Sequence, residues 1–145
     1  MEEYKCSFKV NNLEPYFKYL EINGYAFNET KKETRIIFKN ENGTAARISI
    51  DESRGLKVKK LEFKGVSSNE SLPIFFEASD TIKSVLNVLE YQKDSCMIKT
   101  KFSYSKNGIT IKLDDFEKPE KMGLVTILGD QEIVDELYYD IKDLN

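Results

Sequence analysis

Apolar and polar residues alternate along much of this chain. The opening segment, residues 3–10, shows the pattern most clearly, because Tyr4, Cys6, Phe8 and Val10 share one parity and Glu3, Lys5, Ser7 and Lys9 the other. A period of two is that of a β-strand with one apolar and one polar side. The same reasoning predicts further strands over residues 34–40, 45–51, 56–65, 72–78, 97–104, 108–114 and 123–128, most of them joined by short turns.

Three segments have helical spacing instead. The first follows Asn12 as a cap, carries Pro15 in its first turn and ends at Asn23-Gly24. Asp80 and Asp130 are the predicted caps of the second and third helices, each of which has a stripe of aliphatic residues. The charged runs at residues 29–34 and 115–121 are interpreted as solvated turns.

The two halves of the chain repeat the same order of strand, helix and several antiparallel strands. No stretch is long enough to serve as a linker between domains. We therefore predict a single domain over residues 1–145, of the α+β class, built as an antiparallel β-barrel with about three helices packed outside.

Composition narrows the possible chemistry. The chain has no His, which excludes His-based metal sites and Ser-His or Cys-His dyads. A net charge of −3 argues against a general nucleic-acid surface. Two widely spaced cysteines suggest buried thiols in a reducing compartment. With no apolar run of about 20 residues and no signal-peptide pattern, we expect a cytoplasmic protein without nucleic-acid or membrane partners.

The polar sides of several predicted strands are largely charged. Lys60, Glu62 and Lys64 share one such side, and Lys99 and Lys101 share another. An ordinary solvated sheet face explains each strand taken alone. If the sheet closes with its helices outside, however, these charges line a polar tunnel. Cations enclosed there would need an anion to pair with.

At this point the sequence resembles the CYTH superfamily, the triphosphate tunnel enzymes that include class IV adenylyl cyclases and thiamine triphosphatases. In the second half, Leu89-Glu90-Tyr91 stands for the family's L-G-F, Lys99 to Tyr104 for K-x-R-x-x-Y, and Ile111 to Asp114 for its apolar-Asp strand. Gly123 stands where the family has the glycine before its last acidic strand.

The first half matches in the same order. Glu3 to Val10 resembles the opening E-x-E-x-K-F-x-V, Ala46 to Ser49 resembles L-R-I-R, and Leu61 to Gly65 resembles L-T-x-K-G. The resemblance thus covers nearly the whole chain, and it implies the tunnel fold and a site for a phosphate-rich anion.

The family's carboxylates are mostly missing. Lys5 and Ser7 replace the second Glu and the Lys of the opening motif, and Ile127 and Gly129 replace the two C-terminal glutamates. The resemblance leaves Glu3, Glu77 and Asp114 as candidate ligands for Mg²⁺ or Mn²⁺, which needs at least one or two carboxylates. A lysine at position 5 would also repel a dication. We expect the two-metal chemistry to be lost.

The candidate phosphate-binding residues are better preserved. They are Arg47, Lys64, Lys99 and Lys101, to which Lys5 and Lys9 add two more cations. Lys and Arg side chains on converging strands can hold phosphate oxygens. The predicted function is a catalytically silent tunnel domain that binds a polyphosphate-like or nucleotide-like anion.

Two alternatives remain open. In the first, the remaining carboxylates, with Glu62 as a further candidate, recruit one metal ion and support slow triphosphate hydrolysis or an adenylyl cyclase-like reaction. In the second, the tunnel is vestigial, filled by internal pairs among Lys60, Glu62 and Lys64, and the domain binds proteins. Tyr104 is expected to pack rather than to take part in chemistry. The sequence leaves open whether the chain forms a homodimer.

Overall fold

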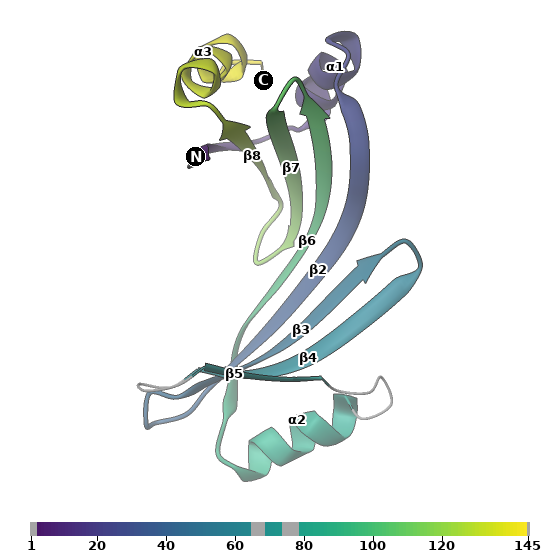
Figure 1. Cartoon of the computed structure of the whole chain (residues 1–145). Helices are drawn as coiled ribbons and strands as arrows, with labels where there is room; N and C mark the ends of the chain where they lie inside the picture. Colours follow the sequence, from purple (N-terminus) through teal and green to yellow (C-terminus); the bar gives the residue numbers. More distant parts are fainter. Residues whose placement is uncertain (1–2, 65–68, 74–78, 145) are drawn as a thin grey trace. The chain divides into compact units, whose positions relative to one another are not determined.

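The computed structural model describes residues 3–64, 69–73 and 79–144, with the backbone alone at 64, 69–73 and 79–81. Its elements are β1 (Tyr4–Val10), α1 (Glu14–Ile22), β2 (Ala26–Lys39), β3 (Ala45–Ser53), β4 (Leu56–Lys64), β5 (Asn69–Pro73), α2 (Ser79–Val88), β6 (Gln92–Lys106), β7 (Ile109–Lys118), β8 (Met122–Gly129) and α3 (Gln131–Ile141) (Figure 1). Within these ranges, no helix is both long and apolar enough to cross a membrane.

The strands form one eight-stranded antiparallel sheet in the order β1-β8-β7-β6-β2-β3-β4-β5. The sheet and the three helices confirm the predicted α+β class, and the repeated order of strand, helix and strands is present as well. A closed barrel needs hydrogen bonds between its first and last strands. Among the described strands no pairing joins β1 to β5, so this sheet is not closed.

The chain divides into two compact units. Unit 1 comprises residues 1–31 and 99–145, and unit 2 comprises residues 32–98. The strands β2 and β6 contribute residues to both units. The single domain over residues 1–145 stays a prediction.

Unit 1 has its core between one face of the sheet and the helices α1 and α3. Alternate residues of β1, β7 and β8 supply the sheet side, and the apolar stripes of the two helices supply the other; the buried members include Val10, Tyr16, Leu20, Ile111, Leu113, Val125, Ile127, Val134 and Ile141. Burying such side chains is the main stabilising contribution in a domain of this size.

The start of α1 packs closely on β8. The N-cap is Leu13 and not the predicted Asn12, whose side chain instead accepts a hydrogen bond from the Glu14 amide at 3.0 Å in an Asx turn just before the helix. Immediately beside this turn, a Cβ on Gly123 would lie 2.7 Å from Leu13 Cγ. Only glycine leaves room for this contact, so the glycine before the last strand has a packing role.

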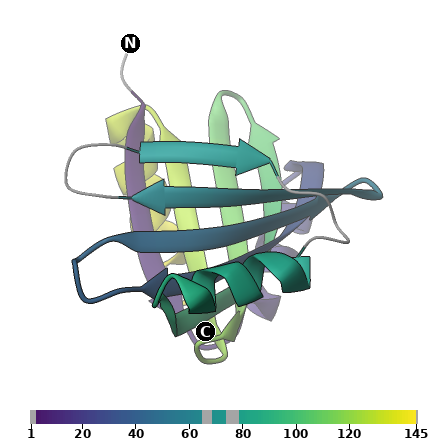
Figure 2. The ribbon, with the colours of Figure 1, turned by 90° about the horizontal axis from the view of Figure 1, so that it is seen from below.

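Unit 2 has a smaller core of the same kind. Phe38, Ala46, Ile48 and Leu61 on one face of its strands pack with Leu86 of α2 and with Tyr91. Figure 2, seen from below, shows α2 in front of these strands. The predicted stripe of the second helix is thus buried only in part, at Leu86 and, less fully, at Ile82, whereas Val85 and Leu89 are exposed.

Three predicted boundaries were wrong. Residues 29–34 lie in β2 and residues 115–118 lie in β7, although both runs were interpreted as turns. The strand β6 begins at Gln92, five residues before the predicted start. In each case backbone hydrogen bonds to a neighbouring strand continue the strand through a polar sequence. Of the predicted strand 72–78, residues 74–78 lie outside the described residues.

Candidate functional site: the polar face of unit 1

The face of unit 1 opposite the helices is built from alternate residues of four strands. In the strand register, Ser7 of β1, Thr126 of β8 and Lys112 of β7 lie side by side in one row across the sheet. The next row consists of Lys9, Leu124 and Asp114. The Ser7 and Thr126 hydroxyls share a hydrogen bond of 3.0 Å. Because the core residues have the other parity, all these side chains are on the polar face.

The turn between β6 and β7 brings further lysines to this face. It consists of Asn107 and Gly108, both with positive φ (50° and 81°), so Lys106 lies opposite Ile109. Counting back along β6 and forward along β7 puts Ser103 opposite Lys112 and Lys101 opposite Asp114. Lys99 shares the parity of Lys101.

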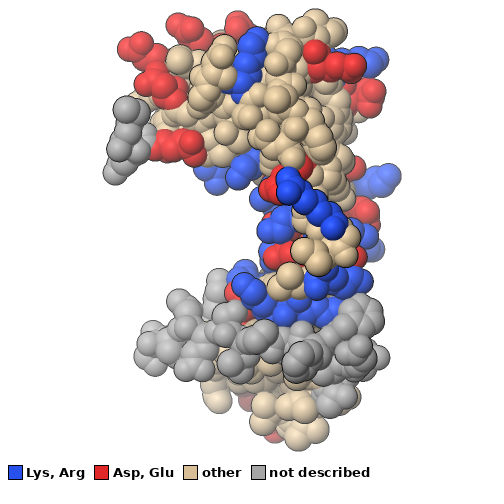
Figure 3. All heavy atoms as spheres, turned by 45° about the vertical axis from the view of Figure 1, so that its right-hand side comes forward, with Lys and Arg blue, Asp and Glu red and all other residues tan. Residues whose placement is uncertain are grey.

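We call this surface the lysine face and define it by Lys5, Lys9, Lys99, Lys101, Lys112 and Asp114. Lys5 and Lys9 are exposed, whereas Lys99, Lys101 and Lys112 are half-buried. Four of the five lysines are sequence-predicted candidates. Lys112 was missed, although its parity with Asp114 in the same strand is a signal that could have found it. Acidic side chains gather instead over the helices of unit 1, at the top of Figure 3.

Asp114 lies at the centre of the lysine face and is 4% exposed. Lys99 Nζ donates a hydrogen bond to Asp114 Oδ2 at 3.5 Å, and the same ammonium lies 5.3 Å from the centre of the Phe116 ring. Asp114 Oδ1 is buried and has no hydrogen-bond partner. By strand parity, one carboxylate and five lysines thus share this face.

Unit 2 has a polar face of different composition. Arg35 Nη1 binds Asp51 Oδ1 at 2.8 Å, and its Nη2 lies 3.8 Å from Glu33 Oε1. Arg47 Nη2 binds Glu62 Oε2 at 2.8 Å, and the Ser49 hydroxyl donates to the other oxygen of Glu62. Both arginines are therefore neutralised by carboxylates of their own unit.

The Glu62 contacts differ from the predicted internal pairs. The vestigial-tunnel alternative pairs Glu62 with Lys60 and Lys64, whereas the described partners of its carboxylate are Arg47 and Ser49. The side chain of Lys64 lies outside the described part of the chain. The reason is register, since Arg47 lies directly opposite Glu62. Hydrogen bonds from Arg47 and Ser49 hold the pKa of the Glu62 carboxyl below its usual range.

This lowered pKa predicts a pH dependence of stability. A carboxyl whose pKa is depressed by folding stabilises the protein above its unfolded pKa, about 4.3, and this stabilisation disappears as pH falls through the lower, folded pKa. We expect the free energy of unfolding to fall less on acidification in Glu62→Gln than in the unchanged protein. Urea denaturation from neutral pH to below 4 measures this difference. Glu52→Gln, at an exposed pair with Lys57, is the matched control and should leave the slope unchanged. Equal slopes for all three proteins would contradict the assignment.

The remaining predicted phosphate-binding residues belong to unit 2. Arg47 is half-buried and bound to Glu62, and its Nε is buried without a partner. Lys64 ends β4, opposite Ala45 and Asn69, and its side chain is outside the described part of the chain. That these two residues bind phosphate together with the lysine face stays a prediction.

The predicted metal ligands do not come together. Glu3 is exposed ahead of β1, whereas Asp114 lies in the row of Lys9, six residues further along β1. At about 3.3 Å per residue the two rows are roughly 20 Å apart. Glu77 is outside the described residues, and those that are described include no group of three His, Cys, Asp or Glu side chains that could hold a metal. Mg²⁺ or Mn²⁺ binding stays a prediction, and we derive no chemistry through it.

Ile127 and Gly129, which replace the family's two C-terminal glutamates in the resemblance, also lie outside the lysine face. Ile127 is fully buried in the core on the helix side, and Gly129 shares its parity. The residues of β8 on the polar face are Met122, Leu124, Thr126 and Leu128. Tyr104 packs as expected, with its ring against those of Phe17 and Phe27.

Comparison with known proteins supports the fold. No family model and no curated protein matches the sequence, but solved structures do. The PH1819 protein of Pyrococcus horikoshii OT3 aligns at a TM-score of 0.58 and 20% identity, over 98% of this chain and 90% of that one. The PH1012 protein of the same organism gives 0.56 and 15%, over 99% and 89%. A protein of Bacillus halodurans called a "putative adenylate cyclase" gives 0.50 and 10%, over 97% and 89%. At these identities the likeness concerns the fold alone.

Proposed function

We propose that this chain is a divergent member of the CYTH superfamily whose lysine face binds a phosphate-rich anion, a polyphosphate or a nucleotide, without metal-dependent catalysis. The observation that carries the proposal is the excess of lysines around one buried carboxylate, Asp114, on a single sheet face. The fold shared with a protein called an adenylate cyclase is in keeping with it.

The arrangement of donors suits an anion with several oxygens. Lysine ammonium groups bind phosphate oxygens as mobile point charges, and hydrogen bonds between charged partners are stronger than neutral ones. Ser103 and Thr126 lie buried between the lysine rows, where hydroxyl groups can donate further hydrogen bonds. An anion that enters the face would add a partner for these lysines.

The contrast with unit 2 separates this proposal from a vestigial tunnel filled by internal pairs. In unit 2 both arginines meet carboxylates, Asp51 and Glu62, at 2.8 Å. On the lysine face, Asp114 is the single acidic member.

Titration with tripolyphosphate and ATP tests the proposal. Binding should release or take up heat in calorimetry and raise the melting temperature, since a ligand at a hundred times its dissociation constant stabilises the native state by about 2.7 kcal/mol. Both effects should appear in EDTA, and we expect no phosphate release on adding Mg²⁺ or Mn²⁺. Sulfate at equal ionic strength is the control for general anion effects. The absence of heat and of any melting shift would refute anion binding, and metal-dependent phosphate release would refute the loss of catalysis.

A further inference from the structure

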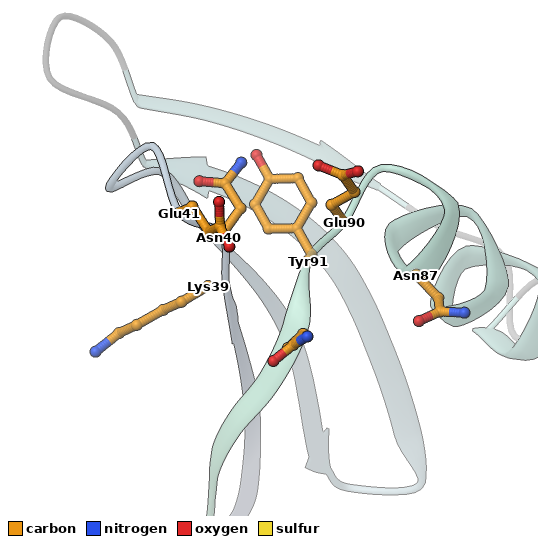
Figure 4. A pocket seen from close by; sticks show the side chains of 7 residues that line it. Lys39, Asn40, Glu41, Asn87, Glu90 and Tyr91 are labelled. Atoms are coloured by element: carbon orange, nitrogen blue, oxygen red, sulfur yellow. The ribbon is translucent and has the colours of Figure 1, made fainter.

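Unit 2 contains a polar pocket that the proposed function does not use. It has a volume of about 580 Å³, within the range of small-ligand sites, and lies where the end of α2 meets the turn between β2 and β3 (Figure 4). Asn40 and Glu41 contribute from the turn, and Asn87, Glu90 and Tyr91 from the end of α2 and the start of β6. All these residues belong to unit 2.

Tyr91 points a hydroxyl into this pocket. Its side chain is 9% exposed, and its ring packs against Phe63 at 6.3 Å between centres. Figure 4 shows the hydroxyl directed between the Asn40 side chain and the Glu90 carboxylate. It has no hydrogen-bond partner among the described residues. The buried side-chain atoms without a partner in the described residues are Arg47 Nε and Asp114 Oδ1. The Tyr91 hydroxyl is not among them, so we treat it as open to a group that enters the pocket.

The charge around the hydroxyl is negative. Glu41 and Glu90 are exposed and form no ion pair with any described residue. The last turn of α2 has no basic residue to balance the negative end of the helix dipole. Lys39 also borders the pocket, but its Nζ binds Asp94 at 3.4 Å and extends away from Tyr91 (Figure 4). The pocket therefore attracts cations.

The backbone of Glu90 is strained. Its φ is +65°, in the left-handed region that glycine normally occupies after a helix. A residue with a Cβ in this conformation is strained by about 1 kcal/mol relative to glycine. Replacing Glu90 by glycine would relieve this strain. The carboxylate can therefore be removed without weakening the fold.

We propose that this pocket binds an organic cation through an ammonium or guanidinium group, with the Glu41 and Glu90 carboxylates and the Tyr91 hydroxyl as acceptors. A divalent metal fits less well, because the described residues include no group of three metal-ligating side chains. Two carboxylates with neighbouring amide and hydroxyl oxygens match instead the several N–H donors of a guanidinium. Two sources offer such a cation, a free amine and an arginine side chain of another protein, and the experiment distinguishes them.

Calorimetric titration of the full chain at low ionic strength tests this inference. The probes are agmatine, spermidine and an acetylated, amidated Gly-Arg-Gly peptide, with the Gly-Gln-Gly peptide as the uncharged control. We expect agmatine to bind and the Gln peptide not to. Tighter binding of the Arg peptide than of agmatine would assign the cation to a protein partner, and the reverse would assign it to a free amine. No binding of any cation tighter than about 10 mM would overturn the proposal.

Variants separate binding from folding. Glu90→Gly and Glu90→Gln should each weaken agmatine binding about tenfold, but only the glycine variant should also raise the melting temperature. Tyr91→Phe should weaken binding and keep the ring packing. Asn107→Gly removes a positive-φ side chain in unit 1 and should stabilise the protein without changing affinity. Unchanged affinity in both Glu90 variants would overturn the proposal. Because tripolyphosphate binding is measured separately, failure here leaves the lysine-face proposal standing.

Discussion

Replacing Lys9, Lys101 and Lys112 together by glutamine is expected to weaken tripolyphosphate binding roughly a hundredfold, at about 1 kcal/mol for each lysine. The three side chains lie in two adjacent rows of the lysine face. Glutamine keeps a polar end on a side chain one atom shorter and removes the charge. The set spares Lys99, whose removal would leave the buried Asp114 carboxylate without its ion pair.

A matched variant controls for the change in net charge. Lys18, Lys83 and Lys93 are exposed and lie outside the lysine face, and their replacement by glutamine removes the same three charges. We expect affinity in this control to change less than threefold, since exposed charges at a distance are screened by salt. Equal loss in the two triple variants, measured by calorimetry at the same ionic strength, would mean that general charge and not the lysine face attracts the anion.

Leu113→Ala should reduce the free energy of unfolding by about 2 to 5 kcal/mol. Leu113 is fully buried in the core of unit 1, and its strand neighbours Lys112 and Asp114 belong to the lysine face. The substitution removes apolar contacts and leaves a cavity beneath that face. Leu56→Ala is the control, because Leu56 is 72% exposed and should cost less than about 0.5 kcal/mol. Urea denaturation of both variants checks the prediction, and similar costs would contradict this assignment of the core.

The sequence predicted those strands best whose polar and apolar sides are distinct. In β1, β7 and β8 the alternation places each side chain on the correct face, because one face is buried against helices. The strands β2 and β6 extend well beyond their apolar segments. Their additional length comes from backbone pairing between strands, which leaves no pattern in the side chains.

The lysines of the candidate site followed from the same alternation, whereas the pairing of the arginines did not. Arg47 and Glu62 meet because β3 and β4 pair in one register, and that register depends on the turn at Arg54-Gly55 and not on the motif that contains Arg47. The pocket beside Tyr91 was not predicted either. It combines residues that lie some fifty positions apart in the chain, and only the folded unit brings them together.

The two-residue turn at Asn107-Gly108 has a consequence for how this surface can evolve. Because side chains alternate, one added residue in the turn would exchange the two sides of β6 relative to β7. Phe102 and Tyr104 would then leave the core, and Lys101 and Ser103 would enter it. Selection for a folded core therefore also preserves the position of the lysines, whatever ligand they bind.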